Sequence, residues 1–224
     1  MSPGKGWRAH LLMLIRAFAR ISESECLFET AYTVLDAEMT GLAVERDELL
    51  AIGAVRMIGP RILLGERFYT LIRPSLPRWG GSVTIHGIRP EDVATAPDLT
   101  QVLPRFADFI NGTVLIGHGV EVDRRFLERA AQRLGLPLPP ARWIDTGRVA
   151  RWLVSQHGTF AEASADRGRF GLEELLEAYG IDVPARHHAL ADAFATAQLW
   201  QRLLWELTAA GVRTMRDLRL IGLC

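Results

Sequence analysis

Cysteine is scarce in this chain of 224 residues, which contains only Cys26 and Cys224. Two cysteines so far apart have neither the spacing of a metal site nor the number that a disulfide framework needs. The composition is 49% hydrophobic, which allows one domain of ordinary size to form a core without cross-links. We therefore expect a single α/β domain in a reducing, cytoplasmic setting.

An excess of charge of either sign is also absent. The 26 basic residues balance the 26 acidic ones, so the formal net charge is zero. Lys5 is the only lysine, and the other basic residues are arginines, which contact phosphates well. A neutral chain has no global attraction to nucleic acid, which excludes a strongly basic protein that coats DNA or RNA.

Long hydrophobic runs are missing as well. No segment reaches the roughly 18 apolar residues of a membrane span, so we expect no membrane partner. The run from Leu11 to Ile15 ends at Arg16 and is too short for the core of a signal peptide.

Residues 7–20 show the pattern of an amphipathic helix, with apolar residues at three- and four-residue spacing: Trp7, Leu11, Leu14, Ile15 and Phe18. The favoured interpretation is a helix packed on the domain. The alternatives are a helix that contacts a protein partner or a second copy of the chain, and a helix that binds a membrane surface. Residues 1–30 are thus predicted to comprise this helix and a connector.

From Tyr32 onward the pattern is typical of strands. Strands are predicted to begin at Tyr32 and to cover Leu49–Ile58 and Arg61–Ile72, and the Gly59-Pro60 turn indicates antiparallel pairing. Helix and strand then alternate, which predicts a mixed sheet flanked by helices. The later helices are expected over Leu99–Ile110, Asp123–Leu134, from Ile144 to Leu153, and over Gly171–Tyr179 and Ala189–Leu207, with short strands over Thr113–Gly117 and Arg142–Ile144.

Asp36 and Glu38 stand two residues apart at the end of the first strand. Side chains alternate across a strand, so both carboxylates point to the same face. Like charges so close raise each other's pKa, and a hard divalent cation with oxygen ligands relieves the repulsion. The alternative is a pair of solvated acids at a turn.

Two further acids strengthen the case for a metal site. Asp123 follows a short buried strand at a helix start, where α/β proteins place ligands, although an acid there also complements the helix dipole. Asp192 lies among small and apolar residues of the last helix, where an acid is costly unless it is paired or metal-bound. His187, five residues earlier, is expected in a loop that can approach the metals, whereas His188 is expected to be a surface residue.

Three segments resemble the motifs of the DEDDh exonucleases, the family of the proofreading subunit of bacterial DNA polymerase III. Residues 36–41 resemble Asp-x-Glu-Thr-Thr-Gly, residues 118–127 resemble a His-Asn-x-x-Phe-Asp-x-x-Phe-Leu string, and residues 187–193 match His-x-Ala-Leu-x-Asp-Ala. The segment His86-Gly87-Ile88 and the pair Asp145-Thr146 add further matches. The resemblance covers about residues 31–203.

This resemblance implies a ribonuclease H-like fold, with a mixed five-stranded sheet in which three antiparallel strands are followed by parallel ones. The exonuclease domain is expected over residues 31–207, followed by a short tail over 208–224. Two divalent cations, Mg²⁺ or Mn²⁺, are implied as cofactors, and the 3′ end of a nucleic acid, DNA rather than RNA, as the partner. The implied roles are metal binding for Asp36, Glu38, Asp123 and Asp192, general base for His187, and substrate binding for Thr40, Gly41, Leu42, His86 and Ile88.

The implied reaction is 3′→5′ hydrolysis, with single-stranded DNA preferred, which releases nucleoside 5′-monophosphates. Met39, Gly119 and Val122 depart from the family pattern and leave the substrate open. An enzyme that trims RNA or short oligonucleotides is therefore the first alternative, and an inactive binding scaffold the second. The short tail favours a stand-alone or otherwise tethered exonuclease over a replicative proofreading subunit. For Leu42 two roles are equally favoured: a residue of the hydrophobic core, or a wedge between the bases of the substrate.

Overall fold

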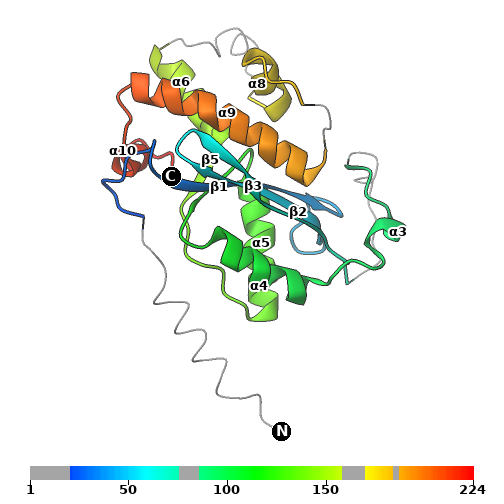
Figure 1. Cartoon of the computed structure of the whole chain (residues 1–224). Helices are drawn as coiled ribbons and strands as arrows, with labels where there is room; N and C mark the ends of the chain where they lie inside the picture. Colours follow the sequence, from blue (N-terminus) through cyan, green and yellow to red (C-terminus); the bar gives the residue numbers. More distant parts are fainter. Residues whose placement is uncertain (1–20, 76–85, 158–169, 184–186) are drawn as a thin grey trace.

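The computed structural model describes residues 21–75, 86–157, 170–183 and 187–224 (Figure 1). The helix expected over residues 7–20 and most of the irregular stretch expected over 156–169 lie outside the described residues. Within the described ranges, no helix combines the length and the apolar composition that a membrane crossing requires.

Five strands form one mixed sheet with the order β3-β2-β1-β4-β5. β1 pairs antiparallel with β2 and parallel with β4, β2 pairs antiparallel with β3, and β4 pairs parallel with β5. The predicted mixed five-stranded sheet is therefore confirmed. The strands are β1 (Ala31–Met39), β2 (Leu49–Ile58), β3 (Arg61–Leu71), β4 (Val114–Gly117) and β5 (Trp143–Asp145).

Helices cover both faces of this sheet (Figure 1). The long helix α9 lies across one face together with α6 and α8, while α4 and α5 lie on the other face. The short helices α3 and α10 were not predicted. The helices are α3 (Pro90–Val93), α4 (Leu99–Ile110), α5 (Glu121–Leu134), α6 (Thr146–His157), α8 (Leu172–Ala178), α9 (Ala189–Ala209) and α10 (Met215–Leu220).

The alternation of side chains along β1 divides the core between these two layers. Tyr32 and Val34 belong to the apolar cluster that contains the buried residues of α9. Leu35 and Ala37 belong to the cluster that contains those of α4 and α5. β1 is therefore buried on both faces, as the central strand of a sheet covered by helices must be.

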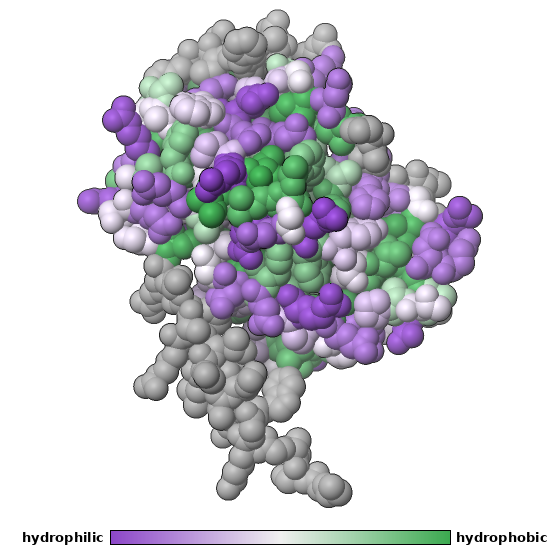
Figure 2. Space-filling model, viewed as in Figure 1, coloured by the Kyte–Doolittle hydropathy of each residue, from purple (hydrophilic) through white to green (hydrophobic). Residues whose placement is uncertain are grey.

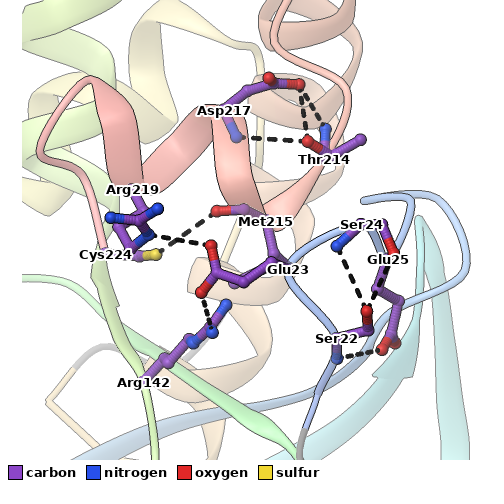
Figure 3. A network of polar contacts seen from close by, with 10 residues as sticks. All are labelled: Ser22, Glu23, Ser24, Glu25, Arg142, Thr214, Met215, Asp217, Arg219 and Cys224. Atoms are coloured by element: carbon purple, nitrogen blue, oxygen red, sulfur yellow. Dashed lines mark hydrogen bonds and ion pairs between the residues drawn. The ribbon is translucent and has the colours of Figure 1, made fainter.

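The connector before β1 is joined to the C-terminal helix by a shared carboxylate (Figure 3). Arg219 donates from Nε to Glu23 at 2.9 Å, and Arg142 donates to the same side chain. The hydrogen bond from Arg219 is the main cause that lowers the pKa of Glu23. Residues 208–224, which were predicted to be a tail, thus contain α10. Through Glu23, Arg219 of α10 is linked to Arg142, the residue that precedes β5.

Trp200→Ala should lower the free energy of unfolding by about 3–5 kcal/mol, because a large cavity would open between α9 and β1. Trp200 is fully buried, and its ring meets that of Tyr32 edge-on with centroids 5.5 Å apart. Urea unfolding measures the change. The matched control is Trp205→Ala on the same helix, where the side chain is 61% exposed and the expected loss is below about 1.5 kcal/mol. Equal losses in the two variants would contradict the burial argument.

Candidate active site

Two carboxylates continue the row of β1 residues that faces α9. Asp36 and Glu38 follow Tyr32 and Val34 at intervals of two along the strand. Because strand side chains at this spacing share a face, the acids point toward α9, as predicted from their spacing. They stand where the apolar row of the core gives way to polar residues.

A glycine in β2 brings the start of α9 to these carboxylates. Gly53 pairs with Asp36 across the two strands. A Cβ atom on Gly53 would lie 2.2 Å from the backbone nitrogen of Leu190 and 2.3 Å from the carbonyl carbon of Ala189. Only a residue without a side chain permits this approach of helix and strand backbones. Asp192, in the first turn of α9, is thereby carried to the sheet.

The result is a cluster of three acids from β1 and α9. Ligand oxygens of Asp36, Glu38 and Asp192 lie within 4.8 Å of one another. Asp192 is buried, and the other two are half-buried. Carboxylate oxygens at these separations form the donor set that a hard divalent cation such as Mg²⁺ or Mn²⁺ takes, so the described residues fit the predicted metal site.

The fourth predicted acid, Asp123, is not among these three and approaches them from the opposite layer. Asp123 lies in the first turn of α5 and is 6% exposed. Its Oδ1 accepts the backbone N–H of Ala37 at 3.0 Å. Ala37 is the residue between the two acids of β1, so Asp123 approaches the cluster at the peptide that links them.

The position of Asp123 depends on a second set of motif residues. Asp145, at the end of β5, accepts the N–H of Val120 at 3.0 Å and the N–H of Arg148 at 3.0 Å, and so satisfies backbone donors at the starts of both α5 and α6. His118 and Thr146 are hydrogen-bonded at 2.9 Å. The motif match around Asp145-Thr146 thus has a structural explanation, since these residues hold the loop that leads into α5.

Burial raises the pKa of two of the predicted metal ligands, Glu38 and Asp123. Burial raises the pKa of Glu38 to about 7, and the charge of Asp192 acts in the same direction. Burial also raises the pKa of Asp123 to about 7, against the hydrogen bonds from backbone N–H groups that lower it. A bound divalent cation would replace these protons and stabilise the ionised carboxylates.

His187 adopts a backbone conformation that is unusual for a residue with a side chain. Its φ is 58°, in the left-handed region, which costs on the order of 1–3 kcal/mol and persists only where surrounding contacts hold it. Its N–H donates to Oδ2 of Asp192 at 2.9 Å. His187 is thus tied through its backbone to one of the clustered acids, while its side chain is exposed. The role of general base stays a prediction.

The predicted substrate residues after β1 differ in exposure. Thr40 is buried, and its hydroxyl accepts the N–H of Glu48 at 3.0 Å, which closes the turn between β1 and β2. Gly41 faces Asp47, whose carboxylate oxygen would lie 2.5 Å from an added Cβ. Leu42 is 80% exposed, which excludes the core position that the sequence left open. Substrate contacts by these residues stay predictions.

The other two predicted substrate residues lie near the end of β1. The N–H of Ile88 donates to Nδ1 of His86 at 3.0 Å. Burial lowers the pKa of His86, the carbonyl of Met39 opposes this effect, and the charge of His187 contributes to it. His86 therefore lies near the carbonyl of Met39, at the end of β1, and near His187.

The departures from the family pattern receive a physical explanation. Gly119 has a φ of 62°, and no atom lies within 4 Å of an added Cβ. Glycine and asparagine are the residues that best tolerate this left-handed conformation, so Gly119 keeps the turn that an asparagine would make. Val122 is 38% exposed, so its small size leaves no gap in the core.

Comparison with known proteins places the chain in a family. The sequence profile of the RNase T exonuclease family matches residues 33–200. The chain therefore belongs to this exonuclease family, a class of hydrolytic nucleases, as the three motifs predicted. A DNA polymerase III subunit epsilon-like protein of Rhodobacter capsulatus is 36% identical over 191 residues, which are 84% of this chain and 26% of that protein. A PolC-type DNA polymerase III of Caldanaerobacter subterraneus is 30% identical over 196 residues, or 88% of this chain and 13% of that protein.

The chain spans less than a third of the length of these relatives. Solved structures show the same fold. Exonuclease I of E. coli in complex with a dT13 oligonucleotide superposes with a TM-score of 0.69 at 19% identity, over 81% of this chain and 42% of that one. Exonuclease X in complex with 5′ overhanging duplex DNA gives a TM-score of 0.62 at 24% identity, over 85% of this chain and 99% of that one.

Gly53→Ala should weaken Mn²⁺ binding, because the added methyl group would push the start of α9, and Asp192 with it, away from β1. Overpacking of this kind costs about 1–3 kcal/mol, and calorimetric titration with Mn²⁺ measures the loss of affinity. Gly65→Ala is the matched control on the neighbouring strand, since no atom lies within 4 Å of its added Cβ. Wild-type affinity in Gly53→Ala would show that the close approach is not what places Asp192.

The metal-free protein should become less stable as pH rises from about 4.5 to about 7. A glutamate ordinarily titrates near 4.5, but the pKa of Glu38 is about 7 in the folded chain. Over this interval the folded state keeps a proton that the unfolded state has released, so the free energy of unfolding falls with rising pH. Urea unfolding in EDTA measures the slope, which Glu38→Gln should reduce. Parallel slopes in the two proteins would refute the assignment to Glu38.

Proposed function

We propose that the chain is a 3′→5′ exonuclease that depends on two divalent cations, Mg²⁺ or Mn²⁺, acts on DNA with a preference for single strands, and releases nucleoside 5′-monophosphates. The observation that carries the proposal is the convergence of Asp36, Glu38 and Asp192 within 4.8 Å, with Asp123 hydrogen-bonded to the intervening peptide. Membership of the exonuclease family supports hydrolysis of a phosphodiester as the reaction.

The four carboxylates hold the cations and fix their positions against the sheet. When bound, the cations supply an activated water and neutralise the charge that develops on the phosphate. Because Asp36 and Glu38 come from the central strand and Asp192 from a helix packed on it, the donor oxygens have little freedom to move. A rigid donor set of this kind lowers the reorganisation that the reaction requires.

His187 accepts the proton of the attacking water. Imidazole is the side chain that most often accepts a proton in general acid–base catalysis. The hydrogen bond from the backbone N–H of His187 to the carboxylate of Asp192 links the base to an acid that holds the cations.

The exposed side chain of Leu42 and the half-buried pair His86 and Ile88 contact the terminal nucleotide. Leu42 projects into solvent from the turn after β1, where a base can stack against it. Exonuclease I and exonuclease X have been solved with DNA, which supports DNA as the substrate class. A chain with no net charge also favours binding of a few nucleotides at a strand end over binding along a duplex. The cytoplasm is the location that we propose.

A digestion panel tests the function. Single-stranded DNA, mismatched duplex DNA, RNA and dinucleotides, each labelled at the 5′ end, are incubated with the protein and Mn²⁺. We expect a ladder of labelled products that shorten from the 3′ end, formed fastest from single-stranded DNA. The unlabelled product should be nucleoside 5′-monophosphate, which chromatography identifies. Faster digestion of RNA or dinucleotides would replace the DNA assignment with the trimming alternative.

Asp36→Asn should lower the rate by more than about a hundredfold, because an amide oxygen carries no charge to hold a cation. Asp108→Asn is the control, since Asp108 is an exposed acid of α4 on the opposite layer, and it should digest DNA as the wild type does. Circular dichroism confirms that both variants are folded. Wild-type digestion by Asp36→Asn, or internal cuts in place of a 3′ ladder, would exclude the proposed mechanism.

A further inference from the structure

Tyr69 of β3 extends the row of residues on the carboxylate face of the sheet. It pairs with Gly53 of β2, which in turn pairs with Asp36 of β1. Residues directly opposite each other on neighbouring strands share a face, so Tyr69 lies two strands from Asp36 on the same side. Burial raises the pKa of the Tyr69 phenol, and the charge of Glu38 adds to this effect.

The core does not require the ring of Tyr69. Its neighbour Phe68 points to the other face, is 9% exposed and meets Phe106 of α4 with ring centroids 5.4 Å apart. Tyr69 is 41% exposed. A half-exposed aromatic residue beside a functional site calls for an explanation other than core packing.

The ring of Tyr69 stacks on the ring of His188. The centroids are 4.7 Å apart, and the planes are inclined by 24°. His188 immediately precedes α9, and its side chain makes no capping hydrogen bond to the helix. The aromatic contact therefore fixes the residue that joins the strained His187 to the helix.

His187 is thus held from both directions along the chain. Among the described residues it is the only non-glycine residue with a positive φ. Its own N–H is bonded to Asp192, while the next residue, His188, is stacked on Tyr69. The hydrogen bond restrains the backbone nitrogen of His187, and the stacked ring restrains the residue that follows it.

We propose that Tyr69 is a positioning residue, whose ring holds His188 and thereby keeps the His187 backbone in the conformation that directs its imidazole. This inference rests on the proposed function, in which His187 is the general base. Tyr69 itself does not transfer the proton. Its contribution comes through the stacked ring and not through the phenol hydroxyl.

Two substitutions at Tyr69 separate the ring from the hydroxyl. Tyr69→Leu removes the stack, and it should lower kcat for single-stranded DNA by about 3- to 10-fold, the range that a lost aromatic pair predicts. KM and the affinity for Mn²⁺ should stay as in the wild type, because the four carboxylates are untouched. Tyr69→Phe keeps the ring and should retain the wild-type kcat. An equal loss in Tyr69→Phe, or a parallel loss of Mn²⁺ affinity in Tyr69→Leu, would overturn the proposal.

A double variant tests whether the effect passes through His187. In the background of His187→Ala, the further change Tyr69→Leu should leave the residual rate unchanged, because the group that Tyr69 positions is already absent. A further 3- to 10-fold loss in that background would show that Tyr69 acts by another route and would overturn the proposal.

A measurement without substrate separates this inference from the proposed function. With ¹⁵N-labelled histidine, NMR signals of the His187 ring, assigned with His187→Ala, report its order in the metal-free protein. We expect one narrow set of signals in the wild type and in Tyr69→Phe, and broadened or shifted signals in Tyr69→Leu. Absence of nuclease activity in every protein would refute the function, whereas an unchanged His187 signal in Tyr69→Leu would refute the positioning role.

Trp205→Leu is the matched control for both measurements. Trp205 lies near the other end of α9, and its ring meets that of Phe28 at the same centroid distance of 4.7 Å. The variant removes the contact between the exposed Trp205 and the half-buried Phe28 but leaves the active-site end of α9 untouched. Figure 2 shows one face of the molecule, coloured by hydropathy. It should keep the wild-type kcat and His187 signals. The same loss in Trp205→Leu as in Tyr69→Leu would reduce the effect to general stability and overturn the positioning role.

Discussion

The contact between the backbone of α9 and Gly53 of β2 is the constraint on which the site depends. A helix normally stays one side-chain layer away from a sheet, and at that distance Asp192 would not reach Asp36 and Glu38. With no side chain on Gly53, the first turn of α9 rests on the strand itself. The same approach helps to place His187, because that residue lies two positions before the start of α9 and its N–H is bonded to Asp192.

The site concentrates features that a protein core ordinarily avoids. Glu38 and Asp123 have pKa values raised to about 7 by burial, and His187 holds a left-handed backbone angle. Each of these costs stability in the metal-free chain. The rest of the fold offsets that cost, since β1 is covered on both faces and α9 buries much of its length against it. The like charges are therefore held on two elements that are extensively buried, β1 and α9.

The motif residues divide into acids that face the cluster and residues that support them. Asp145 satisfies backbone donors at the starts of α5 and α6, and Thr146 bonds His118. Thr40 closes the turn after β1 with its hydroxyl. A sequence motif does not separate these two groups, because both recur at defined spacing from the acids. The structure separates them by what each side chain touches, and it adds Gly53, Tyr69 and His188, which no motif marked.

The sequence by itself determined the strand and helix pattern, the family, and the shared direction of Asp36 and Glu38, because these depend on residues close together along the chain. The Thr214-x-x-Asp217 capping box was also readable and marks α10, which was not predicted. Only the tertiary structure decided that Asp192 meets the acids of β1, that Leu42 is exposed, and that His188 stacks on Tyr69. Such contacts join segments that are far apart in the sequence. The distances between these segments are set by how whole helices and strands pack, and here they depend on the absence of a side chain at Gly53.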